Sequence, residues 1–492
     1  MSAGGPLLRV TFRAAASTAI GAGHAARCVA VADALRAMGA QVRWACDRDA
    51  VPFLTERGVP QDEVCLLQGS ATEGHAGERQ ADGGAQREDA LRTLATGPAD
   101  WFVVDAYALG APWHAEVRAS GARVAAFDDL ADRALDVDLV VNAAAEDGAY
   151  RTLAPRAREA CGLRAAIVGD PARPPAAGAG SLLLAFGAVD AANLTATTLA
   201  ELAAAGMADR RIVVQLGMSA PHRAEVRQAM DALPDATFAP AVPTSPGSPV
   251  LAVGAAGVGL LERMHAGVPS VAVVASGNQR GLGSAAERAG AAVVAATPRQ
   301  AVDAARGLLA DPGTLARMSA AGRVAVDGRG AGRIAREMSR ITGVDLRRAR
   351  MEDARTLLDW RNHPEVRAAS HGTEEIPWAD HVRWLESSLA RPDRHVLVAE
   401  RSGRPVGTLR FDVAGDCATV SIAVDPTLRG AGLGPAMLDA GHAWLLRHDA
   451  RVRRCRAEIR ADNGPSVRAF RAAGYSGGPA TYERPIGQGN QA

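Results

Sequence analysis

The chain has 492 residues, of which 48% are hydrophobic and 22% charged, as in globular proteins, and its length predicts about three domains. Its net charge of +1 gives no reason to expect a nucleic acid or an anionic membrane as partner. No apolar run approaches the about 20 residues of a membrane span, and Arg9 and Arg13 interrupt the only N-terminal apolar stretch, which argues against a signal peptide. The six cysteines include no CxxC pair, so we expect neither disulfides nor a zinc site, and a cytoplasmic location.

Residues 1–170 alternate short apolar runs with helical patterns. A strand is expected over residues 7–13, followed by the glycine turn IGAGH and a helix that Gly39 ends. Further strands are expected over residues 41–46, 101–107, 122–129 and 138–143. This alternation predicts a Rossmann-like domain with a doubly wound parallel sheet.

The same pattern restarts after a segment rich in proline, glycine and alanine at residues 169–180, which we interpret as a linker. Strands are expected over residues 181–187 and 211–217 with a helix between them, and a strand, turn, helix and strand follow over residues 250–275. A second Rossmann-like domain is therefore predicted over residues 178–340, with an exposed connector at 239–249. Ligands of such folds bind at the carboxyl ends of the strands.

The pattern changes again from residue 345, and a third α/β domain is predicted over residues 345–487. It opens with a strand and a helix and continues with three strands over residues 395–400, 404–411 and 418–425. These strands are expected to be antiparallel neighbours with a turn at SGRP. The last six residues, GQGNQA, are expected to form a disordered tail.

Two glycine-rich turns could carry chemistry. The first places His24 at the start of a helix, where backbone amides can face an anion and an imidazole can act as a general base; an ordinary tight turn with a polar tip is the alternative. The second places Gly254 and Gly257 before a helix that carries Glu262. That carboxylate could accept hydrogen bonds from a ribose, or could simply complement the helix dipole.

Seven segments taken together resemble the UDP-sugar hydrolases of the pseudaminic-acid pathway, which have the fold of GT-B glycosyltransferases. They are FRAAAS (12–17), IGAGHAARC (20–28), DAY (105–107), FDDLADR (127–133), FGAVDAANLT (186–195), GAAGVGLLERMHAGVPS (254–270) and GNQ (277–279). The resemblance implies that His24 acts on the water that displaces UDP from the anomeric carbon. It also implies that nucleotide-sugar binding falls to Gly21, Gly23, Arg27, Tyr107, Asp190, Asn193, Gly254, Gly257, Glu262, Asn278 and Gln279.

The chain departs from that family at four positions. Ala15, Ala106, Ala188 and Leu261 stand where the family usually has Asp, His, Gly and Trp. Losing polar groups on the sugar side leaves the identity of the sugar open. It also leaves open a first half that binds a nucleotide sugar without hydrolysing it.

Residues 424–434, VDPTLRGAGLG, form an R-x-x-G-x-G loop between an apolar strand and an apolar helix. Its backbone amides could bind a pyrophosphate, or the loop could be a plain strand-to-helix junction. Together with ADNGPSVRAFRAAGYSGG (461–478) and the WRN of residues 360–362, this block resembles the GNAT acetyltransferases, including those that modify 4-amino nucleotide sugars or ribosomal proteins. The resemblance implies acetyl-CoA as cosubstrate, a splayed strand beside its pantetheine arm, and cofactor contacts by Val424, Arg429, Gly430, Gly432, Gly434, Asn463 and Ser466.

The general acid and base of this third domain stay unassigned. Phe470 stands where many GNAT members carry the tyrosine that protonates the leaving thiolate, and we interpret Tyr475 and Trp360 as packing residues. Asp128 and Asp129 are interpreted as loop structure rather than paired catalytic carboxylates, because adjacent residues point in different directions. Six histidines show no metal-ligand spacing and are interpreted as surface or partly buried structural residues: His114, His265, His371, His381, His442 and His448.

These observations lead to one main hypothesis, a bifunctional enzyme without metal or nicotinamide. The third domain would acetylate an amine on a UDP-sugar, and the first two would then hydrolyse the C1–O bond to give UDP and the free sugar, which are consecutive steps of the pathway. The alternatives are a GT-B glycosyltransferase fused to an acetyltransferase, a degenerate nucleotide-sugar-binding half that serves an active GNAT domain, and a GNAT enzyme that acetylates protein N-termini. The substrate is expected to be a small molecule, whereas the sugar and the oligomeric state stay unknown.

Overall fold

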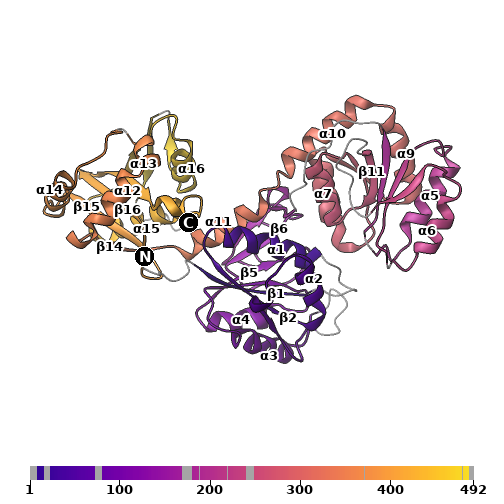
Figure 1. The fold of residues 1–492 in the computed structure, drawn as a ribbon, viewed down its shortest axis with the longest axis horizontal. Coiled ribbons are helices and arrows are strands. Elements are labelled where there is room, and N and C mark those ends of the chain that lie inside the picture. Colours follow the sequence, from indigo (N-terminus) through magenta and orange to yellow (C-terminus); the bar gives the residue numbers. More distant parts are fainter. Residues whose placement is uncertain are drawn as a thin grey trace. The chain divides into compact units, whose positions relative to one another are not determined.

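The computed structural model describes residues 8–15, 23–72, 80–168, 180–187, 189–218, 220–239, 249–370, 372–478 and 480–486. The chain divides into two compact units, one made mainly of residues 10–334 and the other mainly of residues 335–492. The first unit holds two parallel sheets and the second holds a mixed sheet (Figure 1). The two Rossmann-like domains predicted from the sequence are therefore both present in the first unit.

The first sheet has seven strands in the order β3-β2-β1-β4-β5-β6-β7. Their bounds are β1 (Arg9–Ala14), β2 (Gln41–Cys46), β3 (Val64–Leu66), β4 (Trp101–Asp105), β5 (Arg123–Phe127), β6 (Leu139–Asn142) and β7 (Arg158–Cys161). The helices of this part are α1 (Gly23–Arg36), α2 (Val51–Glu56), α3 (Gly83–Leu94) and α4 (Ala111–Ala119). All five residues of β4 are buried, as expected for a parallel strand with both faces covered.

The strand order of this sheet reverses between β1 and β4. The chain builds outward from β1 to β3 and then resumes at β4 on the other side of β1. Ala14, the last residue of β1, pairs with Asp105, the last residue of β4. The carboxyl ends of these two strands therefore form a topological switch point, where a binding crevice is expected in folds of this kind.

The second sheet has six parallel strands in the order β10-β9-β8-β11-β12-β13. Their bounds are β8 (Ser181–Ala185), β9 (Ile212–Gln215), β10 (Ala236–Ala239), β11 (Pro249–Ala255), β12 (Ser270–Val273) and β13 (Ala292–Ala295). The helices are α5 (Leu194–Ala204), α6 (Arg223–Met230), α7 (Val258–Ala266), α8 (Arg280–Arg288), α9 (Pro298–Leu309) and α10 (Pro312–Ala325), and α11 (Gly330–Thr342) follows, with its residues from Ala335 onward in the other unit. Its order reverses between β8 and β11, which gives this sheet a switch point of its own.

Both faces of the second sheet are packed. Leu182 and Leu184 belong to the same core cluster as residues of α5 and α9, whereas Leu183 packs with Ala266 of α7. Figure 1 accordingly shows α7 on one face of this sheet and α5 and α9 on the other. The uninterrupted run SLLLA reflects this burial on both sides.

The third sheet has seven strands in the order β14-β15-β16-β17-β18-β20-β19, and β17 and β18 are its one parallel pair. Their bounds are β14 (Asp345–Arg348), β15 (Arg394–Arg401), β16 (Arg404–Ala414), β17 (Cys417–Val424), β18 (Arg454–Glu458), β19 (Ser476–Gly477) and β20 (Thr481–Pro485). The helices are α12 (Ala354–Asn362), α13 (Pro364–Ala368), α14 (Trp378–Leu389), α15 (Leu433–His448) and α16 (Gly464–Ala472). The three antiparallel neighbours expected from the sequence are β15, β16 and β17.

Three sequence predictions concern segments that lie largely outside the described residues. These are the linker at 169–180, the connector at 239–249 and the tail at 487–492. Within the described ranges, no helix combines the length and the apolar character that crossing a lipid bilayer requires.

Candidate active sites

A histidine and a buried carboxylate meet at the switch point of the first sheet. His24 is the second residue of α1, and Asp105 is the last residue of β4. His24 Nδ1 lies 2.7 Å from Asp105 Oδ1, and the side chains are 12% and 0% exposed. Since Nδ1 faces the carboxylate, Nε2 is the ring atom left to exchange a proton with a substrate or a water.

Arg27, one turn further along α1, holds the charge of Asp105 in place. Its guanidinium donates from Nε and Nη2 to the two Asp105 oxygens at 2.6 and 2.7 Å, and from Nη1 and Nη2 to Asp129 at 2.8 and 2.9 Å. Burial by itself would raise the pKa of Asp105, but the Arg27 and His24 partners outweigh it and hold that pKa well below its usual range. Asp105 therefore stays ionised at neutral pH and can orient and stabilise the imidazole.

Tyr107 completes the cluster around the histidine. Its hydroxyl donates to Asp129 Oδ2 at 2.6 Å, and its ring meets the His24 ring edge to face at 5.0 Å. Burial and the Asp129 charge raise the pKa of Tyr107, so the phenol stays protonated and acts as a donor. The neighbouring Asp128 points elsewhere, because it accepts hydrogen bonds from the Tyr150 hydroxyl and from a backbone amide.

The structure brings together four of the residues expected from the sequence at this site: His24, Gly23, Arg27 and Tyr107. Gly21 lies outside the described residues. Sequence reasoning missed Asp105, and it assigned Asp129 to loop structure although Asp129 belongs to the ion-pair network. Both carboxylates could have been proposed from their positions in the sequence, since DAY and FDD each place an aspartate at the carboxyl end of a predicted strand.

The second sheet brings its two switch-point strands into unusually close contact. A Cβ on Gly254 of β11 would lie 2.2 Å from the carbonyl oxygen of Ala185 in β8, so only glycine fits there. Gly257 directly precedes α7, and the side chain of Glu262 on that helix is exposed. The surrounding protein still desolvates this carboxyl group enough to raise its pKa.

Arg263 is a buried cation beneath this turn. The residue is 1% exposed, and its guanidinium donates to Ser270 Oγ at 3.1 Å and to the carbonyls of Ala255 and Ala185 at 2.9 and 3.4 Å. Burial lowers its pKa to about 10, against the opposing effect of the nearby Glu262 charge. No described carboxylate lies within ion-pair distance of the guanidinium, so a buried positive charge lies next to the start of α7, a feature that sequence reasoning missed.

The remaining polar residues expected at this edge bond to their own loops. The Asp190 carboxylate accepts the amides of Leu194 and Thr195 at 3.0 and 2.8 Å and so caps α5, while Asn193 occupies the cap position itself. Asn278 accepts the Ser276 hydroxyl at 2.6 Å, and Gln279 accepts the Ala275 amide at 3.0 Å. Contacts from these residues to a nucleotide sugar stay a prediction.

Three exposed apolar side chains follow neighbouring strands at this edge. Val189 follows β8, Met218 follows β9 and Val258 opens α7 after β11, and these side chains are 44%, 84% and 39% exposed. The three strands are neighbours in the sheet. Each side chain therefore lies beyond the carboxyl end of its strand, the side on which ligands of such folds bind.

The third sheet opens between its two parallel strands. β17 and β18 pair only from Cys417–Arg454 to Thr419–Arg456, so the rest of β17 separates from its neighbour. Beyond Val424 the chain forms the glycine loop, in which Gly430 and Gly432 have φ of 82° and 72°, and α15 begins at Leu433. This is the splayed strand followed by an amide-rich loop that the sequence predicts.

Polar residues around this loop tie it to a neighbouring segment. Arg429 Nη1 forms an ion pair with Glu365 of α13 at 2.9 Å. Asn463 caps α16 by accepting the Ser466 amide at 3.2 Å, and it donates to the carbonyl of Ala369 at 3.3 Å. Whether Arg429, Asn463 and Ser466 also contact a cofactor stays a prediction.

The aromatic residues near the expected acetyl-transfer centre are packed. Tyr475 is 3% exposed, its hydroxyl lies 2.8 Å from His442 Nε2, and its ring meets Phe470 at 4.9 Å. Burial raises the pKa of Tyr475. Trp360 lies in a separate core cluster with Leu357. These positions agree with a packing role for both Tyr475 and Trp360.

Three histidines interpreted as surface or partly buried are in fact fully buried: His114, His381 and His442. Burial first, and then nearby arginines, lower the pKa of His114 to about 3, so that imidazole is neutral. In the part of the chain that the structure describes, no three histidine, cysteine or carboxylate side chains are grouped closely enough to hold a metal ion. His371 lies outside that part.

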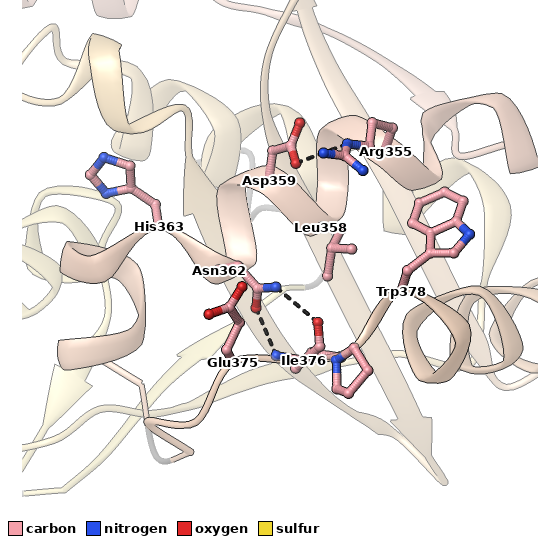
Figure 2. A pocket seen from close by; sticks show the side chains of 9 residues that line it. Arg355, Leu358, Asp359, Asn362, His363, Glu375, Ile376 and Trp378 are labelled. Atoms are coloured by element: carbon pink, nitrogen blue, oxygen red, sulfur yellow. Dashed lines mark hydrogen bonds and ion pairs between the residues drawn. The ribbon is translucent and has the colours of Figure 1, made fainter.

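An open pocket of about 530 Å³ lies along α12 (Figure 2). Asn362 shapes it by bonding the backbone N–H and C=O of Ile376, both at 2.9 Å, and Trp378 is 48% exposed. The lining residues are Arg355, Leu358, Asp359, Asn362, His363, Glu375, Ile376, Pro377 and Trp378.

Comparisons with known proteins find similarities in two parts of the chain. Residues 355–475 match the model of the acetyltransferase (GNAT) family, and no curated protein matches the sequence. The solved glycotransferase of kitacinnamycin is 17% identical, covers 69% of this chain and 100% of its own, and has a TM-score of 0.51. The aminoglycoside acetyltransferase AAC(6')-Ib with coenzyme A is 20% identical over 29% of this chain and 94% of its own, with a TM-score of 0.27.

An acetyltransferase from Thermus thermophilus is 25% identical over 29% of this chain and 97% of its own, with a TM-score of 0.26. The glycotransferase likeness concerns the fold alone. The predicted fold class is confirmed: two Rossmann-like sheets in a glycosyltransferase-like fold, followed by a GNAT acetyltransferase domain.

Proposed function

We propose that this chain is a bifunctional nucleotide-sugar enzyme. Its GNAT domain transfers the acetyl group of acetyl-CoA to an amine of a UDP-linked amino sugar, and its first unit hydrolyses the bond between C1 of the sugar and UDP. The observation that carries the hydrolytic half is the His24–Asp105 contact of 2.7 Å at the switch point of the first sheet. The acetyl-transfer half rests on the glycine loop beside the open strands β17 and β18.

Hydrolysis needs a base for water and a stabilised leaving group. His24 Nε2 takes a proton as the water oxygen bonds to C1, and Asp105 stabilises the imidazolium that forms. The C1–O bond breaks and its electron pair leaves with the β-phosphate oxygen of UDP. Because Arg27 keeps Asp105 ionised, the negative charge that stabilises the imidazolium is present at neutral pH. A general base contributes about 10²–10⁴-fold to such a step.

Three features of the second sheet support a nucleotide diphosphate there. The start of α7 offers backbone amides and a positive helix end, and the buried Arg263 adds positive charge beneath it. Glu262 is exposed on the same helix and can accept ribose hydroxyls. Met218, Val189 and Val258 are exposed apolar side chains on which the base could pack.

Acetyl transfer uses the third sheet. The amides of the loop that ends at Gly434 would hold the pyrophosphate of acetyl-CoA, and the gap between β17 and β18 would hold the pantetheine arm, as in the acetyltransferases that this domain resembles. The neutral amine attacks the thioester carbonyl, the C–N bond forms and the C–S bond breaks, leaving CoA as a thiolate. The proton that the amine loses ends on this thiolate, so the products are the acetamido sugar and CoA as its free thiol. Acetylation before hydrolysis would join two consecutive steps in one chain.

A glycosyltransferase fused to an acetyltransferase is the second candidate. The glycotransferase fold of the first unit favours it, and a histidine–carboxylate dyad can deprotonate an acceptor hydroxyl as readily as a water. The two candidates differ in what they need, because a transferase releases little UDP until its acceptor is supplied.

Mass spectrometry of the full chain with a UDP-4-amino-4,6-dideoxy-2-acetamido sugar, with and without acetyl-CoA, tests the proposal. Wild type is expected to form the acetylated nucleotide sugar and then free UDP, while His24→Ala stops at the acetylated nucleotide sugar. Glu88→Gln, at an exposed carboxylate on α3, is the matched control and should behave as wild type. Acetylation without UDP release in all three proteins would contradict the hydrolytic half.

A further inference from the structure

Two arginines at the junction of α12 and α13 carry positive charge without a counterion. Arg361 is the penultimate residue of α12, and Arg367 lies in α13. In the described part of the chain neither forms an ion pair, and Arg361 Nη1 and Arg367 Nε are buried without a hydrogen-bond partner. Buried donors without partners destabilise a protein, and more so when they are charged. An anion that reached both guanidinium groups would satisfy them.

The two guanidinium groups are near enough to influence each other. The pKa of Arg361 is lowered mainly by burial and, to a smaller extent, by the positive charge of Arg367. Arg361 Nη2 donates a hydrogen bond to the carbonyl oxygen of Gly372 at 2.8 Å. This bond fixes the orientation of the Arg361 guanidinium group. A guanidinium held in place can bind a phosphate through two parallel N–H···O bonds, and a second arginine nearby adds donors and positive charge.

The junction lies beside the acetyl-CoA loop of the same domain. Glu365 of α13 pairs with Arg429 of the loop at 2.9 Å, and Arg460, which follows β18, donates to the carbonyl of Ser370 at 3.1 Å. The segment that follows α12 therefore contacts the residues that come after β17 and those that come after β18, the two strands that separate. A ligand group held there would lie close to the acetyl-transfer centre.

The pocket of Figure 2 is lined by chain neighbours of these arginines rather than by the arginines themselves, and it is the place we assign to the rest of the ligand. Asn362 and His363, which line it, belong to the same junction, and the exposed face of Trp378 can pack on the carbon face of a sugar. The diphosphate of CoA is assigned to the loop amides at Gly430–Gly434, whereas this pocket and the arginine pair lie on another segment. The acceptor is therefore the better source of the anion.

We infer that Arg361 and Arg367 bind a phosphate group of the acceptor, so that the GNAT domain selects an amine carried on a phosphate-bearing molecule. This inference rests on the proposed function for the acceptor, and it assigns the choice of substrate to a pair of residues outside the acetyl-CoA loop. Both a nucleotide-linked acceptor and CoA carry phosphate groups. The experiment below distinguishes which of the two molecules supplies the phosphate that the arginines bind.

The test is acetyl-transfer kinetics of the full chain with two acceptors, a UDP-linked 4-amino sugar and the methyl glycoside of the same amino sugar without phosphate. Arg361→Gln and Arg367→Gln are each expected to raise KM for the UDP-linked acceptor by about tenfold or more, the loss of a charge-assisted hydrogen bond. The kcat, the KM for acetyl-CoA and the KM for the methyl glycoside should stay within about twofold. Arg367→Lys should recover part of the loss, and Arg383→Gln, at an exposed arginine of α14, should change nothing.

Two kinetic outcomes overturn the inference. If the variants raise the KM for acetyl-CoA with both acceptors, the arginines bind a phosphate of CoA instead. If all kinetic constants of both variants are unchanged, Arg361 and Arg367 do not bind a phosphate of the acceptor.

A labelling experiment keeps the test decisive if no acetyl transfer to a UDP-sugar is found, which would count against the proposed function itself. Phenylglyoxal modification of arginines is followed by peptide mass spectrometry, with inorganic pyrophosphate, with CoA or with neither. Protection of the peptides that carry Arg361 and Arg367 by pyrophosphate supports the anion site even without turnover. Equal labelling under all three conditions refutes it.

Discussion

Replacing Asp105 by Asn tests how the base of the first unit works. The change keeps the shape of the side chain but removes the negative charge that lies 2.7 Å from His24 Nδ1. An amide can also present its N–H₂ to the ring and favour the wrong tautomer. We expect the rate of UDP release to fall by about 10²–10⁴-fold, the contribution of a general base, while acetyl transfer by the GNAT domain stays at the wild-type rate.

The same substitution has a stability cost that the structure lets us bound. Asp105 is fully buried and shares Arg27 with Asp129, so its removal leaves that guanidinium half paired rather than bare. A lost partner in a buried pair costs up to about 3 kcal/mol here, the lower end of the usual range. Urea unfolding at neutral pH measures this loss, and single-turnover UDP release measures the catalytic one.

The pH dependence of that stability difference follows from the sign of the shift. The pKa of Asp105 is lower in the folded chain than the ordinary value of 3.8 that applies when the chain is unfolded. Its contribution is therefore fully present above that pH and is lost as the pH falls towards the folded pKa. The difference in unfolding free energy between wild type and Asp105→Asn should be constant from pH 7 to about pH 5 and shrink below pH 3.8. A folded Asp105→Asn protein that releases UDP at the wild-type rate would refute the reasoning.

Three further predictions concern other parts of the chain. Gly432→Ala places a Cβ 2.8 Å from the carbonyl oxygen of Arg336 at a φ of 72°. The strained loop should raise the KM for acetyl-CoA about tenfold or more, whereas an unchanged KM would mean that this loop does not bind the cofactor. Gly254→Ala forces β8 and β11 apart and should destabilise the chain by about 1–3 kcal/mol in urea unfolding. Met218→Glu puts a charge on the exposed apolar surface and should weaken UDP binding about tenfold by calorimetry, whereas equal affinity would place the nucleobase elsewhere.

Much of the fold is predictable from the sequence because its strands are continuous apolar runs. WFVVD and SLLLA are such runs, and they form β4 and β8 as expected. β7 was not expected, because Arg158–Cys161 has no apolar pattern and becomes a strand only by pairing with β6. β3 has three residues and gives too short a signal. Edge strands of this kind depend on their neighbours rather than on their own residues.

The candidate site was predictable only where local motifs carry it. His24 and Tyr107 belong to motifs that the resemblance picks out, and both lie in the observed cluster. Asp105 can contact His24 because β4 lies next to β1 in the sheet. This pairing of two distant strands cannot be predicted from a local sequence pattern. The role of Asp190 illustrates the converse, because an acidic residue before a helix is also the ordinary signal of a cap, and that is the contact observed.

The most direct test of the central claim is hydrolysis of the acetylated UDP-sugar in water enriched in oxygen-18, without any sugar acceptor, followed by mass spectrometry of the UDP. The account predicts that wild type releases UDP carrying no heavy oxygen, since water attacks C1 and the C1–O bond breaks, and that His24→Ala releases almost none. Heavy oxygen in the β-phosphate of UDP, or no release until an acceptor is added, would contradict a hydrolase built on His24 and Asp105.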